Sequence, residues 1–375
     1  MTTTINNKNK KPNVPNLRFP EFQGEWEYFL INDVCSEFKS GKNIKADSVF
    51  ECGEYPVYGG NGLRGYASSY NHEGSYVLIG RQGALCGNVR SVYGKTYITE
   101  HAIAVAGNEK SNTNFLHYLF LKMNLGQYSD QSAQPGLAVN KLLKLKVALP
   151  IISEQTKIAK FLSLLDERIA TQNKIIEKMQ TLIKGIVDST ILRKEKNAIV
   201  GDVCSISEQI RAEANIDDII TVRLHGNGVC KSSAENLQLG ATQYYRRRAG
   251  QLIYGKQNFH NGAIGIVPIS LDNGITSKDI PSFDIDEMKC NSVYLLAQLQ
   301  SPQYYKPAEA LTTGTGSKRL KEETFLKMPI VLPNKREQDN IATLIISISA
   351  NLDQAKKMLD LFSIQKQYLL RQMFI

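Results

Sequence analysis

The sequence is poor in the residues that build metal centres and disulfide frameworks. Its six cysteines lie far apart, at 35, 52, 86, 204, 230 and 290, and none forms a Cys-x-x-Cys pair. The five histidines show no metal-ligand spacing either. We therefore expect reduced thiols in the cytoplasm, and no metal or other cofactor bound by this chain.

Long apolar runs are also missing. The opening segment, Met1 to Pro15, is polar and contains no apolar core of the kind that a signal peptide needs. The longest apolar runs, such as Phe115 to Leu121, are too short to span a bilayer. These absences predict a soluble protein without a membrane partner.

The catalytic motifs that one would seek next do not occur. There is no Asn-Pro-Pro-Tyr methyltransferase motif, and indeed no Pro-Pro pair, and there is no P-loop. The glycine amides of Gly314-Thr315-Gly316-Ser317-Lys318 suit an anion, but the spacing is wrong for a P-loop, which leaves a DNA-touching loop or a plain surface loop. Asp279 with Glu287-x-Lys289 resembles a nuclease pattern only through a short and common spacing. We expect a non-catalytic chain.

Basic residues are what the sequence does have in excess. Its 375 residues allow two ordinary domains or one large one, and 42% hydrophobic content is enough to build folded cores. The formal net charge is +9 and the pI about 9.0. Such a balance favours a polyanionic partner, because Lys and Arg release counterions from phosphates, although many basic proteins bind nothing anionic.

An internal repeat organises the chain. Residues 149–155 read Leu-Pro-Ile-Ile-Ser-Glu-Gln, and 183 positions later residues 332–338 read Leu-Pro-Asn-Lys-Arg-Glu-Gln. In each copy a proline ends a strand-like run, since it cannot donate to a ladder. Ser153 is the expected helix N-cap of the first copy, and Glu154 or Glu337 places negative charge in the first turn against the helix dipole.

Both copies continue as a heptad pattern with apolar residues at alternating steps of four and three. The seam positions are Ile158, Leu162, Leu165, Ile169, Ile176 and Met179 in the first copy, and Ile341, Ile345, Ile348, Leu352, Leu359 and Phe362 in the second. Gln172 and Lys366 interrupt the two seams, and such polar positions fix register. Two helices of roughly 40 residues, about 60 Å each, would pack as an antiparallel coiled coil; the alternative is that each is buried on its own globule.

The blocks between the repeats contain β-rich runs with Gly and Asn turns, and they predict an α+β fold with an internal pseudo-two-fold repeat. Local helices are expected at Asn114–Leu125 and Tyr304–Ala310. The expected organisation is a disordered tail at 1–16, a first globular domain at 17–150, a first long helix at 151–196, a second globular domain at 197–333 and a second long helix at 334–375. Two similar globules held apart by helices would suit two half-sites on one DNA duplex.

Several stretches resemble the specificity subunits of type I restriction–modification enzymes. They are Pro15-Asn16-Leu17-Arg18-Phe19-Pro20-Glu21-Phe22 with Gly24-Glu25-Trp26-Glu27, Tyr55-Pro56-Val57-Tyr58-Gly59-Gly60-Asn61-Gly62, Gln134-Pro135-Gly136-Leu137, and the repeated Leu-Pro and Glu-Gln motifs that open each helix. Their order along nearly the whole chain is more specific than any one of them. The second half lacks the Tyr-Pro-Val-Tyr-Gly stretch, so the resemblance locates its DNA-contacting residues less precisely than those of the first half.

The resemblance implies a role in DNA recognition. Each globule would be a target-recognition domain that reads one half of a bipartite site in double-stranded DNA. The helices would set the spacer between the halves and bind two methyltransferase subunits, which carry S-adenosylmethionine. Restriction subunits would join this core to cleave DNA with ATP and Mg²⁺.

Base reading needs paired donors and acceptors, which Arg, Lys, Asn and Gln in Gly-rich loops supply. Arg81 and Gln82 between glycines are the first choice, and Lys256 and Gln257 are their counterparts in the second half. The other candidates for DNA contact are Lys39, Lys42, Lys45, Asn61, Arg64, Arg90, Arg223, His225, Tyr245, Arg246, Arg247, Arg248, Asn258, His260, Lys318 and Arg319. For each of them a plain solvated side chain is the alternative.

Two other functions compete with DNA reading by a subunit. A self-contained restriction or modification enzyme would need the catalytic motifs that are missing. A coiled-coil scaffold that binds only proteins would need none of the basic loops. Salt separates the scaffold from the reader, since DNA binding weakens steeply with ionic strength and apolar helix packing does not.

Overall fold

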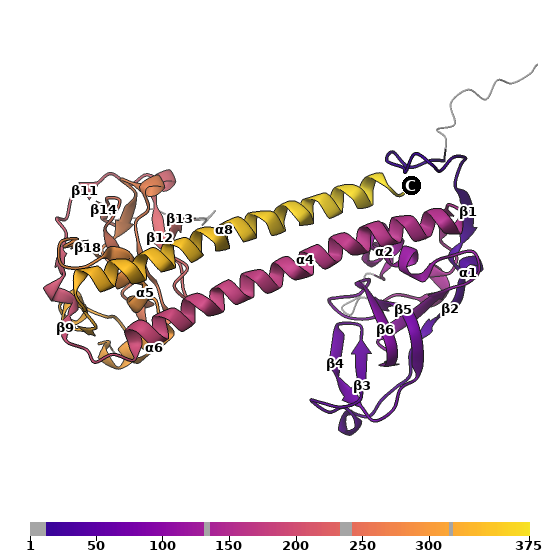
Figure 1. The fold of residues 1–375 in the computed structure, drawn as a ribbon, viewed down its shortest axis with the longest axis horizontal. Helices are drawn as coiled ribbons and strands as arrows, with labels where there is room; N and C mark the ends of the chain where they lie inside the picture. Colours follow the sequence, from indigo (N-terminus) through magenta and orange to yellow (C-terminus); the bar gives the residue numbers. More distant parts are fainter. Residues whose placement is uncertain (1–12, 131–135, 233–241, 315–317) are drawn as a thin grey trace, which may run out of the picture. The chain divides into compact units, whose positions relative to one another are not determined.

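The computed structural model describes residues 13–130, 136–232, 242–314 and 318–375. The chain is α+β with two long helices, as the sequence predicted, and it divides into two compact units (Figure 1). Met1–Gln172 with Met358–Ile375 form the first unit, and Asn173–Lys357 form the second. Of the tail expected at 1–16, residues 1–12 lie outside the described part. Residues 13–16 are folded, since the Trp26 N–H donates to the Asn13 carbonyl at 2.8 Å.

The first unit is built on one six-stranded sheet. In spatial order its strands are β2 (Cys35–Ser40), β7 (Ala102–Gly107), β5 (His72–Gly80), β6 (Val89–Ile98), β3 (Tyr55–Gly59) and β4 (Gly62–Ala67). All neighbours are antiparallel except β3 and β6. Along β5, Val77 and Ile79 enter one apolar cluster and Leu78 enters another, because successive side chains point to opposite faces. This central strand is therefore buried on both sides up to Gly80.

Helix α2 (Thr113–Met123) packs on this sheet, close to the bounds expected from the sequence. A short ladder between β1 (Glu27–Leu30) and β8 (Lys146–Leu149) joins the two ends of the globule, and Pro150 follows β8 directly. The smaller elements are α1 (Ile31–Val34), η1 (Ala46–Ser48), η2 (Leu125–Tyr128) and α3 (Val139–Leu142).

The second unit uses shorter strands in several small sheets. Their orders are β10-β18-β15-β16, β11-β14-β17, β12-β13 and β19-β9, all antiparallel. The strands are β9 (Ala198–Ile199), β10 (Cys204–Ile206), β11 (Arg211–Ala212), β12 (Ile220–Val222), β13 (Val229–Lys231), β14 (Tyr244–Arg246), β15 (Leu252–Tyr254), β16 (Ile264–Ile266), β17 (Ile275–Ser277), β18 (Ser282–Ile285) and β19 (Pro329–Ile330). The helices are η4 (Val200–Asp202), η5 (Ile216–Asp218), η6 (Phe259–Asn261), η7 (Ile269–Leu271), α5 (Ser292–Leu299), α6 (Pro302–Tyr305), η8 (Lys306–Leu311) and α7 (Glu322–Leu326). The helix expected at Tyr304–Ala310 is thus divided between α6 and the 3-10 helix η8.

Rings fill the core of the second unit. Four aromatic side chains are fully buried there: Tyr254, Phe259, Phe283 and Phe325. They form five ring contacts, whose centroid distances are at most 5.7 Å. Aromatic packing of this kind adds stability beyond the area it buries. In the second unit this packing adds stability to a core whose strands are only two to four residues long.

The two long helices are α4 (Ile152–Val187), which continues into a π turn η3 (Asp188–Leu192), and α8 (Lys335–Gln372). Every seam position predicted from the heptads is buried or half-buried. In the first unit the opening turns of α4 share a core with the closing turns of α8, and in the second unit the closing turns of α4 share a core with the opening turns of α8. Within each unit the two helical segments run in opposite directions (Figure 1).

The polar seam position Lys366 is part of an ion pair between the helices. Its ammonium lies 2.5 Å from one carboxylate oxygen of Asp166, and the Tyr118 hydroxyl donates to the other at 2.9 Å. Both charged side chains are mostly shielded from water. The pair therefore fixes the register of the helices within the first unit, as a polar seam position does in other coiled coils.

The expected N-cap at Ser153 is wrong. Helix α4 already begins at Ile152, so Ser153 lies within the first turn. Glu154 is completely buried and forms a two-pronged pair with the Arg18 guanidinium, at 2.8 and 2.7 Å. Its charge therefore holds the N-terminal segment onto α4 in addition to facing the helix dipole.

Candidate nucleic-acid interface

One glutamine in each repeat ties its globule to its helix. Gln155 accepts a hydrogen bond from the Asn112 N–H at 2.8 Å, and its amide donates to the carbonyls of Lys110 and Pro150 at 2.9 and 2.8 Å. Asn112 in turn caps α2 by accepting from the Phe115 N–H. The glutamine thus joins the start of α2 to the start of α4 by three bonds.

The second repeat contains the same arrangement. Gln338 accepts from the Asn291 N–H at 2.9 Å, and its amide donates to the carbonyls of Lys289 and Pro333 at 3.2 and 2.8 Å. Asn291 caps α5 as Asn112 caps α2. Both glutamines are almost completely buried. The Glu-Gln motif therefore marks a structural joint, and the two units are built alike around it.

A loop at the end of a central strand is also repeated. In the first unit β5 ends at Gly80, the Arg81 N–H donates to the His101 carbonyl, and the Leu137 N–H donates to the Arg81 carbonyl, both at 2.9 Å. In the second unit the Lys256 N–H donates to the Asp279 carbonyl and the Leu320 N–H to the Lys256 carbonyl, again both at 2.9 Å. Arg81 and Lys256 are therefore equivalent, as the sequence predicted.

Gly80 is required where it stands. A Cβ there would lie 2.5 Å from the Leu85 carbonyl oxygen and 2.9 Å from that of Gly60. These are backbone atoms that cannot move aside cheaply. The absence of a side chain lets the turn between β3 and β4 approach the Arg81 loop.

This approach gathers predicted side chains at one corner of the first unit. A Cβ on Gly62 would lie 3.0 Å from the Arg90 guanidinium carbon, and one on Gly59 would lie 2.8 Å from Cδ of Arg64. His101 Nδ1 lies 3.3 Å from the Gln82 side-chain oxygen. We call the set of Asn61, Arg64, Arg81, Gln82, Arg90 and His101 the first reading corner. All six are exposed or half-buried.

Lys39, Lys42 and Lys45 lie on β2 and on the segment that follows it, and all three are exposed. The Lys39 ammonium lies 3.1 Å from Glu37, whose carboxylate also contacts His72. Burial acts to raise the pKa of Glu37, but the hydrogen bonds from Lys39 and His72 together keep it lowered. Exposed lysines on a strand edge suit phosphate contacts, which position a duplex without reading it.

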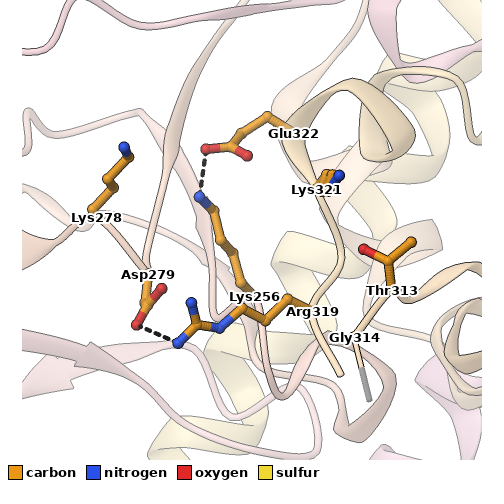
Figure 2. Close-up of a pocket in the computed structure, with 8 residues that line it drawn as sticks. All are labelled: Lys256, Lys278, Asp279, Thr313, Gly314, Arg319, Lys321 and Glu322. Atoms are coloured by element: carbon orange, nitrogen blue, oxygen red, sulfur yellow. Dashed lines mark hydrogen bonds and ion pairs between the residues drawn. The ribbon is translucent and has the colours of Figure 1, made fainter. Parts of the chain in front are cut away.

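The equivalent corner of the second unit is an open cavity of about 640 Å³. Lys256, Lys278, Asp279, Thr313, Gly314, Arg319, Lys321 and Glu322 line it (Figure 2). Within it Lys256 pairs with Glu322 at 2.6 Å, and Arg319 pairs with Asp279 at 3.4 Å. Four cationic side chains thus face two carboxylates. We call this set the basic cavity.

Sequence reasoning missed Lys278 and Lys321 as members of the basic cavity. Lys278 is the neighbour of Asp279, which had been considered only for a nuclease pattern, and Lys321 follows the predicted Lys318 and Arg319. The available signal was their adjacency to residues already singled out. Asp279 is engaged with Arg319, and Lys289 lies 3.3 Å from Asp286, so the structure does not join them as a nuclease site.

The remaining candidates of the second unit are placed as follows. Exposed side chains are those of Arg223, His225, Arg246, Arg248, Gln257, Asn258, Lys318 and Arg319, while Tyr245, Lys256 and His260 are half-buried. His225 has a left-handed backbone with φ 61°, and its N–H donates to the Asn261 carbonyl. Lys318 pairs with Glu309 at 3.0 Å. All of these side chains reach the surface at least in part, as DNA contact requires.

Arg247 was predicted to contact DNA, and this is wrong. Its side chain is completely buried, and all three nitrogens of its guanidinium donate to protein acceptors. Arg247 directly follows β14 and points inward, whereas its neighbours Arg246 and Arg248 are exposed.

Some predicted features cannot be placed or carry no chemistry. Thr315, Gly316 and Ser317 of the Gly-Thr loop, and Gln134 and Pro135 of the Gln-Pro-Gly-Leu stretch, lie outside the described residues. Within the described ranges no cluster of three or more His, Cys, Asp or Glu side chains is arranged to hold a metal ion. Nor does any helix there combine the length and apolar character needed to cross a membrane.

The geometry defines a class of protein: two α+β units built around the same glutamine joint to a long helix, each with a polar corner at the end of a central strand. Comparison with known proteins agrees. A model described as the type I restriction modification DNA specificity domain matches residues 23–181. The EcoprrI type I restriction enzyme specificity subunit of Escherichia coli is 37% identical over 199 residues, which cover 52% of this chain and 47% of that protein.

One further relative and one solved structure are also similar to this chain. A putative type I restriction enzyme specificity subunit of Haemophilus influenzae is 28% identical over 144 residues, 38% of this chain and 37% of that protein. The matched part thus spans about half of the first relative's length, or less. The crystal structure of the type I restriction–modification S subunit from M. genitalium shares the fold, with a TM-score of 0.69 at 14% identity, over 96% of this chain and 99% of that one.

Residues 23–181 thus match the DNA specificity domain of type I restriction–modification systems, and the chain is similar to specificity subunits of that class.

Proposed function

We propose that this chain reads a bipartite DNA sequence, with the first reading corner on one half-site and the basic cavity on the other. The observation that carries the proposal is the repeated loop: Arg81 and Lys256 are held by the same two backbone bonds in units that are otherwise unlike in sheet architecture. A shared frame with different side chains suits two readers of different sequences. Arg and Lys donate to guanine, Asn and Gln bind adenine, and carboxylates accept from cytosine.

The long helices would set the spacing of the half-sites and bind two copies of a methyltransferase subunit. In support, apolar side chains are exposed at matched positions of both helices. Phe161 and Ile175 of α4 are 39% and 37% exposed, and Leu344 and Met358, each 183 positions later in α8, are 48% and 40% exposed. An apolar pair repeated in both helices suits two copies of one partner.

The chain itself would have no catalytic role and would bind no cofactor. S-adenosylmethionine would belong to the methyltransferase subunits, and ATP with Mg²⁺ to restriction subunits that join the same complex. This division is what the resemblance to type I specificity subunits implies, and the sequence contains no methyltransferase or P-loop motif that would speak against it.

An exchange of domains tests the proposal. Residues 17–150 are replaced by the first globule of another specificity subunit, the chimaera is produced with its methyltransferase partner, and host DNA is sequenced for adenine methylation. We expect a new sequence in one half of the motif, with the other half and the gap unchanged. A change in both halves would show that the globules do not read independently.

Salt dependence separates the reader from a protein scaffold. Binding of a duplex that contains the motif should weaken with added salt, with a log–log slope of about −0.9 per phosphate contacted. Assembly with the methyltransferase, which rests on apolar helix faces, should change much less. A DNA affinity that is indifferent to salt would favour the scaffold.

A further inference from the structure

Arg247 is the largest fully buried side chain of the described residues. It follows β14 directly, and its guanidinium makes four hydrogen bonds. Nε donates to the Thr276 hydroxyl at 2.8 Å, Nη2 to the Ile280 carbonyl at 2.9 Å, and Nη1 to the Ser282 hydroxyl at 3.0 Å and to the Gln209 side chain at 3.4 Å. The Tyr245 ring lies 5.7 Å from the guanidinium carbon.

All of these acceptors are neutral. No carboxylate in the described part of the chain lies within ion-pair distance of Arg247. Burial lowers the pKa of the guanidinium to about 10, which still leaves it charged at neutral pH. A buried charge is tolerated only when its donors are satisfied, so the four bonds must be kept as a set.

Three of the four acceptors belong to one short segment, from Thr276 in β17 to Ser282 at the start of β18. The Thr276 hydroxyl also donates to the Ile280 carbonyl at 3.0 Å. The guanidinium therefore closes this turn from within. The turn cannot shift without breaking bonds to a buried charge.

The same turn forms one wall of the basic cavity. It carries Lys278 and Asp279 on its outer side (Figure 2). The Asp279 carbonyl accepts from the Lys256 N–H, and the Asp279 carboxylate pairs with Arg319. Arg247 thus fixes the backbone that positions three charged residues of the cavity, namely Lys278, Asp279 and, through the Asp279 carbonyl, Lys256.

We propose that Arg247 is a positioning residue for the basic cavity: it determines how the second half-site is read without touching DNA. This inference rests on the proposed function. It assigns sequence discrimination in one half-site to a side chain inside the protein, through the placement of Lys278 and Asp279.

The test uses the full chain together with its methyltransferase partner. Three variants loosen the turn: Arg247→Met removes the charge, Arg247→Lys keeps it with fewer donors, and Thr276→Val removes one acceptor at nearly constant volume. Arg211→Met is the matched control, because Arg211 is an exposed arginine on β11, which pairs with β14. For each protein the methylation of cognate sites is compared with that of sites carrying one altered base in either half.

We expect Arg247→Met to reduce discrimination in the second half-site between about 5-fold and about 100-fold, the range that one well-placed base contact supplies. Discrimination in the first half-site should stay within twofold, which provides an internal control for stability. Arg247→Lys should recover part of the loss, Thr276→Val should show a smaller loss, and Arg211→Met should behave as the wild type.

Three outcomes would overturn the inference. They are unchanged discrimination in the second half-site, an equal loss in both halves, and a lysine variant no better than the methionine variant. If Arg247→Met does not accumulate, Thr276→Val and Arg247→Lys decide the question in the same assay. A wild-type chain that directs no split methylation motif would instead refute the proposed function.

Discussion

Replacement of either joint glutamine should loosen one unit and spare the other. In Gln155→Ala the Asn112 N–H and the carbonyls of Lys110 and Pro150 lose their partner in a site from which water is excluded, since Gln155 is 0% exposed. An unsatisfied buried polar group costs 1–3 kcal/mol, and some of the three will find other partners. We expect a loss of about 3 kcal/mol, which for a unit of this size lowers its Tm by about 6–12 °C.

The charged variant sharpens this prediction. In Gln155→Glu the carboxylate still accepts from the Asn112 N–H, but it cannot donate to the two carbonyls that faced the amide. At neutral pH this variant should be less stable than Gln155→Ala. Burial against two carbonyls raises the pKa of the new carboxyl in the folded state, so the variant should regain stability as the pH falls, when the protonated group can donate.

Hydrogen exchange read by mass spectrometry separates the two units. Gln155→Ala should accelerate exchange in α2 and the opening turns of α4, and Gln338→Ala should do the same in α5 and the opening turns of α8. Gln180→Ala, on an exposed face of α4, is the control. The reasoning fails if Gln155→Ala costs less than about 0.5 kcal/mol, or if it loosens both units equally.

Three further outcomes are expected. Gly80→Ala should abolish reading of the first half-site, because its Cβ would meet backbone oxygens at 2.5 and 2.9 Å, whereas Gly255→Ala, whose Cβ meets only the Ala263 Cβ at 3.4 Å, should read normally; methylation mapping compares them. Burial lowers the pKa of His117 from 6.5 to about 4, so between these pH values the unfolded chain binds a proton that the folded chain does not. The stability of the first unit should therefore decrease as the pH is lowered from 6.5 to 4. A His117→Gln chain that melts with the same pH dependence would contradict this. Phe161→Asp and Leu344→Asp should each weaken methyltransferase binding at least tenfold in titration calorimetry. Leu344→Asp should leave the melt unchanged, whereas Phe161→Asp should also lower the Tm of the first unit because it removes the packing of Phe161 on Phe19. Normal binding by both variants would remove the helix faces from the partner interface.

Local patterns predicted the long-range plan of this chain well. The heptads, the repeated Leu-Pro and Glu-Gln motifs and the α+β composition each depend on neighbours within a few turns, and periodicity alone reveals the buried face of a helix. The equivalence of Arg81 and Lys256 could be predicted for the same reason, because each follows an apolar run and a glycine.

Contacts between distant segments were beyond such patterns. Glu154 meets Arg18 from 136 positions away, and nothing local distinguishes this carboxylate from an ordinary first-turn acid. Lys278 and Lys321 reach the basic cavity only because β17 and the segment before α7 fold beside Lys256. Arg247 was misassigned because the run Arg246-Arg247-Arg248 was interpreted as one basic cluster. In extended backbone neighbouring side chains point to opposite sides, and here Arg247 is the buried one.

The most direct test of the account is to sequence the DNA of cells that produce this chain with its methyltransferase partner. We expect adenine methylation at a split motif with a fixed gap, in which Arg81→Ala alters one half and Lys256→Ala the other. A continuous motif, or a split motif in which both substitutions alter the same half, would contradict the assignment of one reader to each unit.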